Sequence, residues 1–401
     1  MKIGILGEGF ENWGGGIDFL RIISESIVYA DPSVELHFLF SKSEPHYRLK
    51  KIFHFFKATL FKAGGRSYKR SIPLDQMHLI DLVNSIDGNV YIHFIDFEMS
   101  SLRKVVKKNK IDVLLPAIKP LKGQNVPWIG YLHDYQHAYI PELFSKKEIS
   151  ARCKHFNLML KEAKHVIINA RSVEEDIKRF NPEYKSKIIT LPFSASPNKK
   201  WFEITPVDLT TFGIAYPYFI MCNQFWQHKD HLTGWKAFAE LLEKFPNVEL
   251  VCTGEPFDHR NPNYFSTLMN QAENLKIKPR LKILGLISKE DQISLLRQSI
   301  ALIQPTLFEG GPGGGAVFDA VSLGIRSIVS DIPVNRELNE SGVVFFEAGN
   351  HFSLAKCMLK EVVNFEEYEE DSSKSLMAAG KKRRVLCGRL LLNEISHTLG
   401  T

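Results

Sequence analysis

The chain has 401 residues, of which 44% are hydrophobic and 24% are charged, and its formal net charge is +6 at pH 7. This composition is typical of a soluble globular protein, and the length suits two domains of roughly 200 residues each better than one core. The mild, diffuse basicity argues only weakly for nucleic-acid binding, and no apolar run approaches the ~18 residues that span a membrane.

Short β-rich runs alternate with amphipathic stretches in the first half of the chain. Strands are expected at residues 2–6, 34–40, 90–94, 113–115, 128–132, 166–169 and 188–191, and helices at 17–29, 98–108 and 172–179. Apolar strands that alternate with helices predict a parallel sheet covered on both faces. The opening run has one lysine and is interrupted by Glu8, which is typical of a first strand and not of a signal peptide.

Residues 196–217 break this rhythm and are expected to connect two domains, because prolines recur there without periodicity. The alternation then restarts, with strands expected at 218–222, 248–252, 281–284, 300–304, 327–329 and 343–345, and helices at 231–244, 264–275, 289–298, 314–323 and 351–362. Residues 1–195 and 218–375 are thus predicted to be two doubly wound α/β domains, followed by a basic helical tail at 376–401. Ligands of such sheets bind beyond the carboxyl ends of the strands, so both domains would face a central cleft.

The glycine-rich stretch GGPGGG, residues 310–315, follows one of these strands and precedes a helix expected to begin near Gly314. A helix start leaves main-chain N–H groups unpaired, and together with the helix dipole they form an anion site. Glycine also lets a ligand approach the backbone closely. Gly311, Gly313, Gly314 and Gly315 are therefore candidates to bind a diphosphate, and the alternative is a flexible surface loop.

Two acidic residues flank these glycines. Glu309 precedes them, and Asp319 lies one to two turns into the expected helix. A carboxylate repels phosphate, so we expect Glu309 to point past the phosphate toward sugar hydroxyls. Asp319 can accept two hydrogen bonds from a ribose diol; considered alone, it would be part of a solvated helix face.

The segment PTLFEGGPGGGAVFDAVSLGIRSIVSDIPVNREL resembles the donor-site signature of retaining GT-B glycosyltransferases of family 4, and the likeness extends over most of residues 218–362. It departs from the family pattern in two respects. Glu309 and Asp319 are separated by nine residues, two more than is usual, and the second acid is Asp in place of Glu. The resemblance implies a GT-B fold, in which two Rossmann-like domains bind the acceptor (residues 1–195) and the nucleotide-sugar donor (residues 218–375).

This resemblance also implies an activity. The expected reaction moves a hexose from a nucleotide-diphosphate sugar, with GDP-mannose favoured, to a saccharide or lipid-linked acceptor in bacterial surface-polysaccharide synthesis. Such an enzyme needs no cofactor, since the nucleotide sugar is its substrate. Two alternatives remain: a nucleotide-sugar epimerase or phosphorylase-like enzyme on the same scaffold, and a relative that binds without turnover.

The resemblance assigns roles to residues that follow the first strand of the second domain. Lys229 falls at the family's phosphate-binding lysine, and a lysine is a compact cation suited to phosphate. Asn223 or Gln224 stands where the family has an arginine, so a bidentate fork is missing and the glycine amides would compensate. Judged alone, Lys229 would be an ordinary surface lysine.

Two further candidates belong to the first domain. Gly14, Gly15 and Gly16 precede a helix and resemble the family's N-terminal glycine loop, which closes over the donor phosphates or the acceptor; a tight turn is the alternative. His133 and Asp134 follow a strand and match a family pair that faces the transferred sugar. His133, together with Glu309, is therefore expected to be catalytic, although a single histidine is more often structural.

No metal site is expected, because the chain has neither Asp-x-Asp after a strand nor a tight His/Cys cluster. Lys229 and main-chain dipoles would neutralise the phosphate charge instead. The base pocket of the donor is expected near Gly285, Leu286 and Ile287.

Residues 48–70 form a basic, aromatic segment whose apolar residues recur at helical spacing. Bases and large apolar residues on opposite faces are typical of a helix in an anionic membrane interface, where the acceptor could be lipid-linked. An amphipathic helix packed on the first domain explains the same pattern. Nucleic acid is not expected as a partner, since no binding module accompanies the segment.

The cysteines are odd in number and scattered, without a Cys-x-x-Cys pair. Reduced thiols in a cytoplasmic protein are the expected interpretation. The predicted location is thus the cytoplasm, with the inner face of the cytoplasmic membrane as an additional expectation from residues 48–70.

Overall fold

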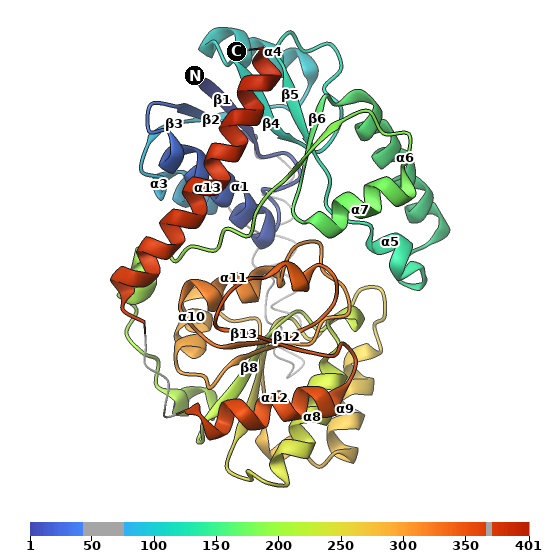
Figure 1. Ribbon diagram of the computed structural model, residues 1–401, viewed down its shortest axis with the longest axis vertical. Coiled ribbons are helices and arrows are strands. Elements are labelled where there is room, and N and C mark those ends of the chain that lie inside the picture. Colours follow the sequence, from blue (N-terminus) through green and yellow to red (C-terminus); the bar gives the residue numbers. More distant parts are fainter. Residues whose placement is uncertain (43–75, 366–370, 401) are drawn as a thin grey trace, which may run out of the picture.

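The computed structural model describes residues 1–42, 76–365 and 371–400, which form two α/β domains that lie one above the other in Figure 1. The prediction for residues 48–70 falls outside the described residues. Each domain contains one parallel sheet with helices packed against it, so the predicted fold class is confirmed.

The first domain is built on a parallel sheet with the strand order β3-β2-β1-β4-β5-β6-β7. Its strands are β1 (Lys2–Leu6), β2 (Glu35–Ser41), β3 (Asn89–Ile95), β4 (Val113–Ala117), β5 (Trp128–Tyr131), β6 (His165–Ile168) and β7 (Lys187–Thr190). The central strands are apolar and buried along most of their length, as parallel strands covered on both faces must be. The sheet order reverses at β1, which opens a crevice at its carboxyl end.

Helices cover this sheet. They are α1 (Gly14–Ala30), α3 (Gln76–Asn84), α4 (Met99–Asn109), α5 (Gln136–Tyr139), α6 (Lys146–Glu162) and α7 (Arg171–Phe180), with a 3₁₀ turn η1 (Pro141–Leu143). Helix α1 buries Ile17, Leu20, Ile23 and Ile27 at the spacing of one helical face. Helix α6 is absent from the sequence predictions, although its capping box of Ser145 and Glu148 is a recognised helix-start signal.

The second domain repeats this plan with the strand order β10-β9-β8-β11-β12-β13. Its strands are β8 (Tyr218–Cys222), β9 (Glu249–Thr253), β10 (Leu281–Gly285), β11 (Leu302–Gln304), β12 (Ser327–Ser330) and β13 (Val343–Phe346). Its helices are α8 (His231–Leu242), α9 (Tyr264–Asn274), α10 (Lys289–Arg297), α11 (Gly314–Ser322) and α12 (His351–Val363), with 3₁₀ turns η4 (Gln227–Lys229), η5 (Lys278–Arg280) and η6 (Asn335–Glu337). The predicted strand at 300–304 is shorter, since only its last three residues are in β11.

Two segments cross between the domains. The first is residues 191–217, which contain the 3₁₀ turns η2 (Lys199–Phe202) and η3 (Leu209–Phe212) and include the predicted connection at 196–217. The second leads into α13 (Ser373–Leu399), which begins near the second domain and runs along the first (Figure 1).

Helix α13 includes residues 376–399 of the tail predicted at 376–401, and it packs directly on α1. A Cβ at Gly388 would lie 1.8 Å from the carbonyl oxygen of Ser26, so only glycine allows this approach. Cys387, Leu391 and Ile395 of α13 join the hydrophobic core around α1. Helix α13 is thus an integral part of the first domain. Within the described residues, no helix is both long and apolar enough to cross a membrane.

Candidate functional site

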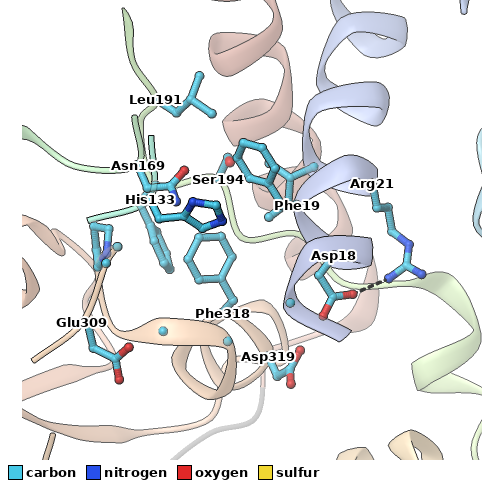
Figure 2. Close-up of a pocket in the computed structure, with 18 of the residues that line it drawn as sticks. Asp18, Phe19, Arg21, His133, Asn169, Leu191, Ser194, Glu309, Phe318 and Asp319 are labelled. Atoms are coloured by element: carbon cyan, nitrogen blue, oxygen red, sulfur yellow. Dashed lines mark hydrogen bonds and ion pairs between the residues drawn. The ribbon is translucent and has the colours of Figure 1, made fainter. Parts of the chain in front are cut away.

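A cavity of about 440 Å³ lies between the two domains, where loops that follow the strands of both sheets meet. Figure 2 shows side chains of both domains at this cavity, with Asp18, Phe19 and Arg21 on α1 and Phe318 and Asp319 on α11. The first domain contributes the start of α1 and the loops after β5, β6 and β7, and the second contributes the loops after β8 and β11 together with α11. This is the predicted central cleft.

Helix α11 begins at this cavity, with its positive dipole end toward it. Gly314 and Gly315 line the cavity, and a Cβ at Gly315 would meet no atom within 4 Å, so its backbone borders open space. The Gly314 N–H makes a long hydrogen bond of 3.4 Å to the Gly311 carbonyl. The Gly315 N–H has no acceptor within the helix, because α11 begins only one residue earlier. These amides can therefore bind an anion.

Gly313 is placed differently from its neighbours. It does not line the cavity, and its N–H donates to Asn335 Oδ1 at 2.8 Å. Its φ of +71° and the proximity of Val317, 2.5 Å from a hypothetical Cβ, require glycine on structural grounds. Gly313 therefore shapes the loop, while its predicted donor-binding amide is already occupied.

Lys229 and Glu309 form an ion pair in the cavity wall. Lys229 Nζ lies 2.5 Å from Glu309 Oε1, and the side chains are only 13% and 10% exposed. Gln304, at the end of β11, donates from Nε2 to the same Glu309 oxygen at 3.0 Å and to the Gly313 carbonyl at 3.0 Å. The predicted pair of phosphate-binding and sugar-binding residues is thus brought together on one surface of the cleft.

Asn223 lies behind this wall. It is 6% exposed and does not line the cavity, and its Nδ2 donates to Gln304 Oε1 at 2.7 Å. Gln224 also bonds elsewhere, accepting from the Glu255 N–H. The structure therefore places Asn223 as a support for Gln304, which in turn orients Glu309.

The two domains touch at the glycine-rich loop. A Cβ at Gly310 would lie 2.7 Å from Asp134 Oδ2, and a Cβ at Gly311 would lie 3.2 Å from the Cβ of Asn169. Gly311 lines the cavity, and both glycines also allow the loop to approach the first domain. Asn169 was not predicted, although it follows β6 at the same sheet edge.

Asp319 lines the cavity but already has partners. Its Oδ2 lies 2.5 Å from Lys289 Nζ and accepts from Gln292 Nε2 at 3.1 Å. Burial raises the pKa of the Asp319 carboxyl to about 6, although the nearby Lys289 ammonium opposes the shift. A ribose diol at this carboxylate would have to share it with Lys289.

His133 lies in an aromatic cluster at the carboxyl ends of β1 and β5. Its ring packs edge-on to Tyr131 at 4.7 Å between centroids, and stacks near Phe10 at 6.3 Å. Burial lowers the pKa of the His133 imidazole, so the ring is neutral near pH 7. A neutral imidazole can donate one hydrogen bond and accept another, which suits a sugar hydroxyl.

The N-terminal glycines have mixed positions. Gly15 lines the cavity, whereas Gly16 is buried below it and its N–H donates to the Trp13 carbonyl. A Cβ at Gly16 would lie 2.3 Å from the carbonyl oxygen of Phe10. Of Gly15 and Gly16, the two glycines predicted to bind the donor, only Gly15 therefore lines the cavity.

Several lining residues were missed because helices distant in sequence supply them. Arg21 bonds to Asp18 at 2.9 Å within α1 (Figure 2), and Arg384 of α13 lies 3.3 Å from Glu25. Nothing in the sequence pattern shows that α13 returns to α1. On the opposite wall, α11 lines the cavity along a single face with the helical spacing of residues 315, 318, 319 and 322.

The expected base pocket lies away from this cavity. None of Gly285, Leu286 and Ile287 lines it, and Leu286 is 45% exposed at the end of β10. Among the described residues, no group of three His, Cys, Asp or Glu side chains is placed to hold a metal ion.

Comparison with protein families found a match over residues 213–375 to the family described as glycosyl transferases group 1. The match covers the second domain, including α11, Lys229 and the Glu309 loop. This part of the chain, less than half of its length, is therefore similar to the group 1 glycosyl transferases. A comparison with curated proteins found no significant match.

Solved structures resemble the whole chain. Sucrose-phosphate synthase (tll1590) from Thermosynechococcus elongatus has a TM-score of 0.62 at 11% identity, covering 100% of this chain and 99% of that one. Anabaena Alr3699/HepE, in complex with UDP and glucose, has a TM-score of 0.61 at 17% identity, covering 99% and 100%. WaaG, a glycosyltransferase involved in lipopolysaccharide biosynthesis, has a TM-score of 0.55 at 12% identity, covering 100% of both. The chain has the GT-B fold, as predicted, while assignment to family 4 stays a prediction.

Proposed function

We propose that this protein is a metal-independent, retaining glycosyltransferase that moves a hexose from a nucleotide-diphosphate sugar to a saccharide or lipid-linked acceptor. The observation that carries the proposal is the start of α11, whose Gly314 and Gly315 amides open on the interdomain cavity beside the Lys229–Glu309 pair. A helix N-terminus with an adjacent ammonium group matches a diphosphate in charge and in hydrogen-bond donors.

The donor is expected to extend along α11. The diphosphate would lie at Gly314 and Gly315, with Lys229 as the neighbouring cation. The hexose would extend toward Glu309, and the ribose toward Asp319, one to two turns along the same helix face. Along the chain, Glu309 precedes the Gly314 and Gly315 amides and Asp319 follows them. The proposed order of hexose, diphosphate and ribose follows from these positions.

The chemistry rests on stabilisation of the departing diphosphate. The acceptor hydroxyl attacks the anomeric carbon on the face from which the phosphate leaves, and its proton passes to a phosphate oxygen. Glu309 is not assigned as a nucleophile, because Oε1 already accepts from Lys229 and Gln304. His133, neutral by virtue of its lowered pKa, would hydrogen-bond the transferred sugar or the attacking hydroxyl.

The donor base and sugar are expectations from resemblance. GDP-mannose is the favoured donor on family likeness, whereas the solved Anabaena HepE structure contains UDP and glucose. A role in bacterial surface-polysaccharide synthesis at the cytoplasmic membrane face belongs to the same proposal, supported by the structural likeness to WaaG.

Titration calorimetry with UDP, GDP, ADP and CDP tests the donor site, and incubation with labelled UDP-glucose and GDP-mannose tests turnover. One nucleoside diphosphate is expected to bind more tightly than the others, and its sugar to be hydrolysed or transferred with retention at the anomeric carbon. Product analysis separates this activity from epimerisation, which leaves an intact nucleotide sugar, and from phosphorolysis, which needs phosphate. No binding of any nucleotide would contradict the proposal.

A further inference from the structure

Trp13 is an exposed aromatic residue held in a fixed position at the cavity. It precedes the first residue of α1, lines the cavity, and is 45% exposed. Its indole Nε1 donates to the Gly9 carbonyl at 3.0 Å. A large aromatic ring that is both anchored and open to solvent offers a preformed contact surface with little ordering cost.

The adjacent glycines make room for this ring. A Cβ at Gly15 would lie 2.3 Å from an indole carbon of Trp13, and a Cβ at Gly16 would lie 2.7 Å from Trp13 Nε1. The indole therefore lies against the bare backbone of the first turn of α1. Any larger residue at either position would displace it, so the two glycines determine where Trp13 lies.

Two polar residues line the same cavity as the exposed indole. The ring centroid of His133 lies 6.3 Å from that of Trp13, and Asp134 follows His133 along the same loop. Asp134 is partly buried; its Oδ1 accepts from the Gln136 N–H at 2.9 Å and lies 3.9 Å from Arg152 Nη1. This part of the cavity thus combines the apolar face of one aromatic ring with hydrogen-bonding side chains.

We propose that Trp13 is the platform on which a hexopyranose unit of the acceptor stacks, with its hydroxyls bonded to His133 and Asp134. This inference rests on the proposed function and selects a saccharide acceptor. A pyranose has C–H groups on its face and hydroxyls around its edge, which matches this arrangement. An acyl chain does not match it, because it would remove water from the Asp134 carboxylate without replacing the lost hydrogen bonds.

The position of Trp13 also separates this subsite from the donor. The donor-binding amides and Lys229 belong to the second domain, whereas Trp13 and His133 project from the first. A hydroxyl of the stacked unit would form the new bond to the anomeric carbon while the bond from that carbon to the diphosphate breaks. The hydroxyl proton then goes to the released phosphate. Trp13 acts here as a positioning residue.

Binding to an array of immobilised oligosaccharides, with acyl-chain glycolipids and bare acyl chains alongside, tests this proposal. The wild-type protein is expected to bind a subset of saccharides, Trp13→Ala to bind them about ten-fold more weakly, and Trp13→Phe to lie between the two. UDP and GDP affinities by calorimetry are expected to stay within about two-fold in both variants. Phe352→Ala removes an exposed aromatic residue of α12 outside the cavity and is the matched control.

Three results would overturn the inference: no saccharide binding by the wild-type protein, equal binding by Trp13→Ala, or binding of bare acyl chains alone. Thermal melting establishes whether each variant is folded. If Trp13→Ala does not fold, saccharide binding by Trp13→Phe is compared with that of the wild-type protein instead. If the wild-type protein binds no nucleotide, the proposed donor site is refuted instead. Failure of the acceptor proposal is therefore distinguishable from failure of the proposed function.

Discussion

The Glu337 carboxylate of the second domain accepts a hydrogen bond from the Arg171 N–H of the first, at 2.8 Å, and a second of 2.8 Å from Ser172. Arg171 begins α7, so the carboxylate caps a helix N-terminus across the cleft. Glu337 shares the 3₁₀ turn η6 with Asn335, which holds the Gly313 N–H. One turn therefore contacts both the glycine-rich loop and the opposite domain.

Replacing Glu337 by Gln is expected to loosen this closure. The amide keeps one acceptor oxygen but loses the charge that favours the helix N-terminus, at a cost of about 1 kcal/mol. Small-angle scattering is expected to show a larger radius of gyration, and calorimetry a weaker nucleotide affinity. Glu175→Gln, an exposed carboxylate within α7 paired with Lys178, is the control. An unchanged radius and affinity would show that the contact does not hold the cleft closed.

The Lys229–Glu309 pair allows a test that separates stability from function. Each single replacement by alanine is expected to abolish transfer, and Lys229→Ala also to destabilise the protein by roughly 3 kcal/mol, because it leaves the Glu309 carboxylate buried without its cation. The double variant is expected to recover much of that stability but no activity. Chemical denaturation and donor hydrolysis measure the two properties. Transfer at the wild-type rate in either single variant would contradict the assigned site.

Gly315 and Gly313 form a matched pair at the start of α11. Alanine at Gly315 meets no neighbouring atom and favours helix formation, so stability is expected to be unchanged or raised by up to about 1 kcal/mol. Its methyl group would nevertheless occupy the diphosphate position and weaken nucleotide binding about ten-fold or more.

Alanine at Gly313 is expected to have the opposite effect. Its positive φ and the contact with Val317 make the residue strained, so stability falls by at least about 1 kcal/mol. Thermal melting and calorimetry of both variants provide the comparison. A Gly315→Ala protein with undiminished nucleotide affinity would show that the diphosphate does not approach this amide.

Asp319 is expected to govern a pH dependence of stability. The pKa of the folded Asp319 carboxyl, about 6, exceeds its ordinary value of 3.8, so between these pH values the folded carboxyl holds a proton that the unfolded one has lost. Its contribution to stability is therefore complete below about pH 4 and decreases as the pH rises to about 6. Asp319→Asn removes this trend, and urea denaturation from pH 4 to 7 compares the two. Parallel pH profiles would contradict the shifted pKa.

The sequence patterns were sufficient for the sheets because parallel strands are buried on both faces and appear as short apolar runs bounded by turns. They also located α11, whose glycines mark its start. They did not reveal that α13 packs on α1, since helical periodicity shows which face is buried but not which partner covers it. Arg21, Glu25 and Arg384 were missed for this reason.

The individual roles of glycines were equally hidden. Gly313 and Gly315 look alike in sequence, yet one amide is held by Asn335 and the other borders open space. Similarly, Gly15 and Gly16 leave room for the Trp13 indole, and this contact depends on the direction in which the Trp13 side chain points. Such distinctions arise from tertiary packing and not from local propensity.

A crystal structure of the protein with its preferred nucleoside diphosphate tests the central claim most directly. The account predicts the diphosphate in the interdomain cavity, within hydrogen-bond distance of the Gly314 and Gly315 amides and next to Lys229. A nucleotide bound outside this cavity, or bound within it with its phosphates turned away from α11, would contradict the account.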